Sequence, residues 1–199
     1  MNNILSKIRL AHYTRFLGNQ FDVYESGNTS APNILSFPPG VNRHWYTFIT
    51  DGMSNNNQPL ERFALMNAQE WKRIELVFYL SETHNGDVNW VVETLARMAQ
   101  FPWQHETFIA WYHTYSEVQP PTELGKFRHI LFLPPYLEDS SFDCLQIEES
   151  TVHILWGVPI TNAELDFQKQ NRGKSLETRL WPVLQINGPG FNSSRSPVV

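Results

Sequence analysis

Seven segments of the chain have the apolar patterns of β-strands: residues 21–24, 34–37, 45–50, 74–80, 128–133, 142–147 and 152–160. Residues 152–160 alternate most regularly between large apolar and other side chains, which predicts a strand with distinct faces. Residues 74–80 carry apolar side chains on both faces, as is typical of a central strand covered on both sides. Residues 148–151 are short enough to form a hairpin turn between the last two strands.

Helical spacing of apolar residues predicts two further elements in the first half of the chain. Residues 4–17 form the first helix, and Gly18 is well suited to end it, because glycine adopts the backbone conformation that closes helices. Residues 88–99 show the clearest helical pattern, and Pro102 is expected to end this helix.

Two more helices are expected near the end of the chain. Thr161 and Glu164 have the spacing of a capping box, in which each side chain bonds the backbone of the other residue. Ser175 can cap the last helix, whose regular length Pro182 should limit. The order of helix, strands, helix, strands and helices predicts an α+β domain: a mixed, largely antiparallel sheet flanked by helices.

The chain length of 199 residues suits one domain, and the 14% of aromatic residues supply large apolar side chains for its core. We expect a single domain over residues 1–186. Residues 187–199 read NGPGFNSSRSPVV, and this composition predicts a disordered tail that can be deleted with little effect on stability.

Charge and hydropathy exclude several classes of protein. No apolar run reaches the ~18 residues of a membrane-spanning helix, and the first residues lack the apolar core of a signal peptide. The net charge of −5 argues against a nucleic-acid partner, which would require a basic face. We therefore expect a soluble cytoplasmic protein without a nucleic-acid or membrane partner.

Motifs for metal, cofactor or phosphate binding are missing from the sequence. Cys144 is the single cysteine, so the chain has neither an internal disulfide nor a cysteine-based zinc site. His105 and His113 are eight residues apart, which suits a shared metal ion in neither a helix nor a strand. We predict no metal and no cofactor.

Catalysis by known arrangements is also not indicated. Cys144 could serve as a nucleophile with His153 or His113 as its base, but a single cysteine in a strand is usually an inert apolar residue. The acidic pairs at 138–139 and 148–149 fall in expected turns, whereas a glycosidase needs two carboxylates facing each other across a cleft. We expect no enzyme activity.

Residues 103–115 hold five aromatic residues and two histidines. One interpretation is a core strand with a satisfied histidine. The other is a partner-binding patch, because Trp and Tyr dominate the energetics of protein interfaces. The binding interpretation makes Tyr112, His113 and Tyr115 candidate contact residues, with the two tyrosines as candidate hot spots.

The segment WYTFITDGMS, residues 45–54, resembles the aromatic strand followed by Gly-Met-Ser that marks the Suppressor-of-fused domain family. Other similar pieces follow in the same order, and the likeness runs from about residue 20 to residue 184. These pieces are residues 74–80, 90–102, 113–114, the strand before Pro134-Pro135, and 152–164.

The resemblance implies a non-catalytic binding domain. Animal members have a second domain and sequester a zinc-finger transcription factor by clamping an extended peptide. This chain is too short for that domain and looks like the single-domain bacterial type, whose implied role is as an immunity protein against a toxin. The family's Gly-Asp-His stretch is altered here to Trp111, Tyr112 and His113, so the animal peptide specificity should not be carried over.

The function predicted from these observations is an intracellular protein-binding module of immunity type that sequesters a toxin or another protein. Residues 138–149 contain five acids and no basic residue, so we expect them to form a face for a basic toxin domain. Alternatives are a hydrolase of unrecognised type with a His113-centred pocket, and a self-associating scaffold. The oligomeric state is left open. The acids are Glu138, Asp139, Asp143, Glu148 and Glu149.

Overall fold

The computed structural model describes residues 2–26, 31–41, 43–63, 68–81, 88–116, 118–120, 125–147, 149–171, 175–187 and 195–199. Its helices are α1 (Asn2–Leu17), α2 (Val88–Gln104), α3 (Asn162–Asn171) and α4 (Ser175–Asn187). Short 3₁₀ turns η1 (Met53–Asn55), η2 (Ala68–Trp71) and η5 (Ser140–Phe142) link some of the strands. The strands are β1 (Asp22–Tyr24), β2 (Asn33–Phe37), β3 (Trp45–Asp51), β4 (Arg73–Ser81), β5 (Thr114–Tyr115), β6 (His129–Leu133), β7 (Cys144–Ile147) and β8 (Ser150–Ile160).

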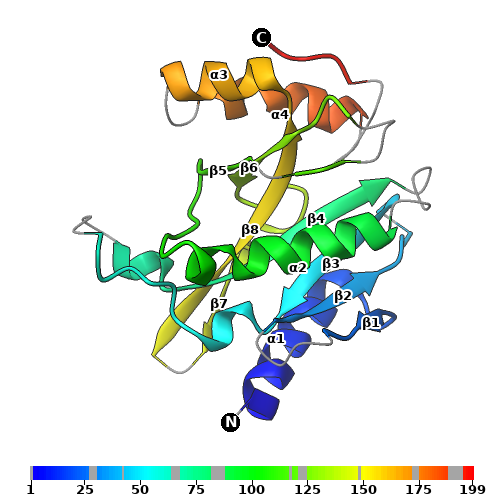
Figure 1. The fold of residues 1–199 in the computed structure, drawn as a ribbon. Helices are drawn as coiled ribbons and strands as arrows, with labels where there is room; N and C mark the ends of the chain where they lie inside the picture. The colour runs from blue at the N-terminus through cyan, green and yellow to red at the C-terminus, as the bar shows by residue number, and fades with distance from the viewer. Residues whose placement is uncertain are drawn as a thin grey trace.

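One sheet contains all of these strands, in the order β1-β2-β3-β4-β8-β6-β5, with β7 paired to β8 outside this path. Among the pairings of the described strands, only that of β4 with β8 is parallel, so the prediction of a mixed, largely antiparallel sheet is confirmed. The expected hairpin between the last two strands is present, because Ile147 pairs with Ser150. The long strand β8 runs through the middle of the molecule and contacts β4, β6 and β7 (Figure 1).

The sheet separates two apolar cores. Buried residues of α2, including Leu95 and Met98, pack on one face. Residues of α1, α3 and α4, such as Tyr13, Leu165 and Leu180, belong to the core on the other face. This arrangement explains why residues 74–80 are apolar on both sides: residues 74–80 of β4 are all buried. No helix among the described residues is both long and apolar enough to cross a membrane.

The end of the family signature forms a buried polar network. The carboxylate of Glu75, which is fully buried, accepts hydrogen bonds from Ser54 N (3.0 Å), Ser54 Oγ (2.6 Å) and Gly52 N (3.2 Å). Arg9 of α1 donates to Asp51 over 2.5 Å and lies 3.5 Å from Glu75. Gly52 has φ +127°, a conformation that side chains disfavour. These signature residues therefore join α1 to the sheet.

The segment 103–115 is not a core strand, which corrects that interpretation. Helix α2 continues through Pro102 to Gln104, and only Thr114 and Tyr115 form a strand. Pro102 lies in the last turn of α2, where its missing N–H removes one helical bond, while Phe101 O and Pro102 O still accept from His105 N and Thr107 N. Residues 105–113 are a loop.

Residues 195–199, which fall in the segment expected to be a disordered tail, pack on the domain instead. Arg195 is 3% exposed, and its guanidinium donates to Glu164 and to Pro159 O. Asn187 belongs to α4, and residues 188–194 lie outside the described residues. The Gly, Pro and Ser content of this segment does not reveal that Arg195 has a buried acidic partner.

Candidate functional site

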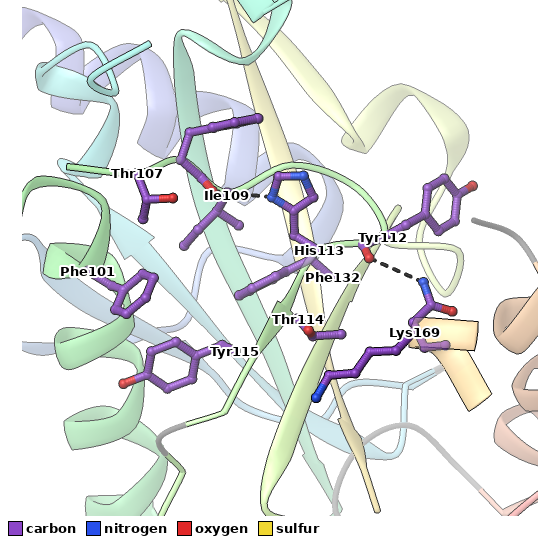
Figure 2. Close-up of a pocket in the computed structure, with 11 residues that line it drawn as sticks. Phe101, Thr107, Ile109, Tyr112, His113, Thr114, Tyr115, Phe132 and Lys169 are labelled. Carbon is purple, nitrogen blue, oxygen red and sulfur yellow. Dashed lines mark hydrogen bonds between the residues drawn. The ribbon is translucent and has the colours of Figure 1, made fainter. Parts of the chain in front are cut away.

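An open cavity of about 580 Å³ lies next to β5, at the end of the sheet path (Figure 2). Its walls come from the end of α2, the loop before β5, β5 and β6 themselves, and α3. All three candidate contact residues that the sequence indicated in this region line the cavity. The lining residues are Phe101, Thr107, Phe108, Ile109, Tyr112, His113, Thr114, Tyr115, Phe132, Gln168 and Lys169.

The backbone at Tyr112 has the pattern of a G1-type β-bulge. Tyr112 N donates to Phe132 O (2.7 Å), and Phe132 N donates to His113 O (3.0 Å). Two residues of this strand edge therefore face one residue of β6. Tyr112 has φ +67°, in the left-handed region that usually requires Gly, Asn or Asp. Such outliers gather at functional sites, because the surrounding structure must hold them.

A hydrogen bond from α3 helps to hold the backbone of Tyr112 in place. Gln168 of α3 donates to Tyr112 O over 3.2 Å, as the dashed line in Figure 2 marks. Tyr136 donates a hydrogen bond to Glu177 of α4. Burial, together with Glu177, raises the pKa of the Tyr112 hydroxyl above its ordinary value. Tyr112 is therefore half-buried, and its backbone is bonded to both β6 and α3.

His113 is held mainly by its apolar surroundings. Its Nδ1 lies 3.2 Å from Phe108 O, and the Phe108 ring meets the imidazole edge-on with centroids 4.8 Å apart. Burial lowers the pKa of His113, which favours the neutral ring. The described lining residues of the cavity include no carboxylate that could orient a catalytic imidazole. His113 therefore lies in a pocket, as the hydrolase alternative requires, but the described lining offers no carboxylate to assist it as a base.

Tyr115 forms part of the cavity wall. Only 5% of its surface is exposed, and its ring packs perpendicular to Phe101 with centroids 5.0 Å apart. A hot-spot residue on a free surface would expose much more of its ring. Tyr115 can therefore contact a partner only from within the cavities that it lines.

The acidic residues of 138–149 do not form one continuous face. Glu138 is half-buried; burial raises its pKa, and the nearby Arg43 opposes this shift. Asp139 is exposed, but its carboxylate accepts from Ser141 N (2.8 Å) and Ser141 Oγ (2.6 Å) at the start of η5. These hydrogen bonds lower the pKa of Asp139. The carboxylates of residues 138–139 therefore already interact with other groups of the same chain.

The other acids lie at or beyond the two ends of β7. Asp143, half-buried, directly precedes this strand, and its main-chain oxygen accepts from Ile154 N (2.7 Å). Glu149, exposed, follows β7 in the hairpin turn. Glu148 lies outside the described residues. The two expected acidic turns are thus separated by the length of β7, and Asp139 and Glu149 are the exposed acids among those described.

Cys144 and His153 are directly opposite each other in the β7–β8 pair. Burial and the neighbouring Asp143 raise the pKa of the Cys144 thiol, so the reactive thiolate is disfavoured. Both ring nitrogens of His153 are buried without a hydrogen-bond partner among the described residues. In the described part of the chain, no three His, Cys, Asp or Glu side chains form a possible metal site.

The sequence missed Gln168 and Lys169 as site residues. Both lie on α3, more than fifty residues beyond β5, and neither belongs to a motif. Only the helix periodicity could have indicated which face of α3 meets the domain.

Comparison with known proteins shows which proteins share this fold. A family model described as Suppressor of fused protein (SUFU) matches residues 29–189. A putative SUFU homolog from Neisseria gonorrhoeae is similar with a TM-score of 0.69 and 16% identity, over 99% of this chain and 98% of that chain. The Sufu–Fu complex gives a TM-score of 0.71 and 17% identity, over 98% of this chain and 92% of that chain.

Drosophila Suppressor of Fused is similar with a TM-score of 0.70 and 17% identity, over 96% of this chain. The match covers 50% of the Drosophila chain, so this chain spans about half the length of that protein. No curated protein matches the chain. At these identities the solved structures show a shared fold, while the family model covers most of the sequence. The chain therefore belongs to the Suppressor of fused protein family.

Proposed function

We propose that this chain is a protein-binding module and that its partner adds an extended segment beside β5. The observation that carries the proposal is the position of this strand. β5 ends the path of the sheet and borders the aromatic cavity. An outer strand of this kind is a ready template for pairing with another chain.

The register leaves backbone groups available for such pairing. Phe132 bonds the bulge at 112–113, and the next pair along the strands is Thr114 with Leu131. Hydrogen-bonded and non-hydrogen-bonded pairs alternate in antiparallel sheets, so the N–H and C=O of Thr114 should point away from β6. A partner segment could bond these groups while one of its side chains enters the cavity.

The relatives support a protein as the partner. The Sufu–Fu complex shows that a protein of similar fold assembles with another protein. The cavity of this chain adds buried aromatic surface, which supplies contact area at small entropic cost. The described lining residues include no carboxylate, which favours binding over acid–base catalysis.

The experiment compares two variants of one residue. Thr114→Pro removes the outward N–H, whereas Thr114→Ala keeps it and serves as the matched control. A partner isolated by affinity capture should bind the Ala variant like the natural protein and bind the Pro variant at least about tenfold more weakly. Equal affinity of both folded variants would show that β5 is not the docking edge.

Within this function, we propose that the partner is a toxin which the protein neutralises in the cytoplasm. The net charge of −5 and the exposed Asp139 and Glu149 support a basic toxin domain as the partner. Electrostatic steering of this kind acts mainly on the association rate. Replacing Glu138, Asp139, Glu148 and Glu149 by their amides should slow association at low salt, and an unchanged rate would remove the acidic residues from the interface.

A further inference from the structure

We infer that the segment received at β5 is acidic. This inference rests on the proposed function and adds the chemistry of the partner segment. It concerns the surface around β5, not the acidic residues of 138–149, and the two are tested separately.

Basic side chains lie on both sides of β5. The aromatic cavity has Lys169 at its α3 wall, and Figure 2 shows this side chain extending toward Thr114. A second cavity, of about 770 Å³, is lined by Arg97 and Arg128. Tyr115 lines both cavities, so they flank the same short strand. None of the described lining residues of either cavity is Asp or Glu.

These three cations are available to a partner. Lys169, Arg97 and Arg128 are all exposed. None of them belongs to an ion pair among the described residues, and the two arginines make only long hydrogen bonds, of 3.5 Å to Thr94 and 3.4 Å to Gly125 O. Glu117 and Glu123 lie outside the described residues, and the experiment therefore includes their removal.

The basic surface contrasts with the chain as a whole, which has a net charge of −5. Arg97 comes from α2, Arg128 directly precedes β6, and Lys169 lies on α3. Three elements thus bring cations to one strand edge, although no basic run exists in the sequence. Successive side chains of an extended segment point to opposite faces, so acids on one face could meet the cations on that side while the backbone pairs with β5.

Exposed charge pairs are individually weak, so the preference should be collective and sensitive to salt. The probes are fluorescein-labelled peptides of equal length with alternating Glu and Thr, Gln and Thr, or Lys and Thr. Fluorescence anisotropy with the full chain should show the Glu peptide binding about tenfold more tightly than the Lys peptide at low salt. High salt should reduce this difference.

Variants localise the effect. Arg128→Glu combined with Lys169→Glu should reverse the order of the Glu and Lys peptides. Lys7→Glu is the matched control, because Lys7 is exposed on α1 and lines neither of the two cavities. Glu117→Gln with Glu123→Gln should leave the preference for the Glu peptide in place or strengthen it. Circular dichroism and thermal melting confirm that each variant is folded.

The outcomes separate this inference from the proposed function. If Thr114→Pro weakens all three peptides equally and the natural protein does not prefer the Glu peptide, the docking edge stands and the charge inference fails. If Thr114→Pro changes no peptide's affinity, the proposed function fails. Absence of binding by the Glu peptide, or a preference that Lys7→Glu alters as much as the double variant, also overturns the inference.

Discussion

The guanidinium of Arg195 lies 2.5 Å from the carboxylate of Glu164, and both side chains are buried. Glu164 also accepts from Thr161 N (2.8 Å) and Val198 N (3.1 Å), so one carboxylate joins the start of α3 to the last described residues. Helix α3 carries Gln168, which holds Tyr112. The end of the chain and the candidate site are therefore attached to the same helix.

Removing the cation of this pair should destabilise the fold strongly. Arg195→Ala leaves a buried carboxylate without its partner, and losses of about 3–5 kcal/mol are typical of such changes. Urea unfolding should show this loss, while Arg179→Ala, at an exposed arginine of α4, should change stability by less than about 1 kcal/mol. A nearly neutral Arg195→Ala would mean that residues 195–199 are dispensable for folding.

Acid should weaken the same contact. Burial tends to raise the pKa of Glu164, but the hydrogen bond and charge of Arg195 lower it overall, below the ordinary value of 4.5. A carboxyl group whose pKa is lower in the folded state stabilises the fold above its unfolded pKa, and this contribution is lost as the pH falls below that value. Glu164→Gln should therefore show a flatter decline of stability below about pH 4.5 in urea titrations.

His153 should be a site where an apolar residue is stabilising. The imidazole is 8% exposed, packs on Trp71 (4.8 Å between centroids) and Trp111 (5.9 Å), and has no hydrogen-bond partner among the described residues. An unsatisfied buried polar group costs about 1–3 kcal/mol. His153→Leu should thus increase the free energy of unfolding, whereas His44→Leu, at an exposed histidine, should not.

The same variant has a pH signature. Burial lowers the pKa of His153 below its ordinary value of 6.5. The unfolded chain then binds a proton more readily than the folded one, so this histidine reduces stability as the pH falls below 6.5. His153→Leu should lack this part of the pH dependence. A variant that is less stable at pH 7 would indicate that His153 has a partner in solution.

Local patterns in the sequence predicted the elements well. Alternation located β8, and the spacing of Thr161 and Glu164 predicted the capping box, whose two backbone bonds measure 2.8 and 3.3 Å. Both signals act within a few residues. The second role of Glu164 could not be predicted, because its partner Arg195 lies 31 positions away in a Gly-, Pro- and Ser-rich segment.

The candidate site was only partly predictable for a related reason. The aromatic residues near β5 form one stretch of sequence, so their composition drew attention to them. The neighbouring cations Arg97, Arg128 and Lys169 come from separate elements and meet only through the topology. Charge counted along the chain pointed instead to residues 138–149, where the fold separates the acids at either end of β7.

Gly157 should tolerate no side chain. A Cβ at this position of β8 would lie 1.7 Å from Cε1 of Phe78, which is fully buried in β4. Forcing extra atoms into a packed core usually costs about 1–3 kcal/mol, so Gly157→Ala should lower the melting temperature clearly. Phe78→Leu added to Gly157→Ala should recover part of the loss. Gly40→Ala is the control, because a Cβ there would meet nothing within 4 Å.

At position 112, a glycine variant should be more stable than an alanine variant, which is the reverse of the usual order. Its φ of +67° is unfavourable for any residue with a Cβ, by roughly 1–2 kcal/mol. Tyr112→Ala and Tyr112→Gly lose the same ring contacts, so their difference isolates the backbone term. The glycine variant should be the more stable by about 1 kcal/mol, as measured by urea unfolding.

Tyr136 provides the comparison, because it is not among the non-glycine residues with positive φ. There the alanine variant should match or exceed the glycine variant, since glycine adds conformational entropy to the unfolded chain. The two Tyr112 variants should also bind the same peptides equally if the residue serves to shape the bulge. If Tyr112→Ala is as stable as Tyr112→Gly, the backbone at the bulge adopts an ordinary φ in solution, and the strained turn beside β5 does not exist.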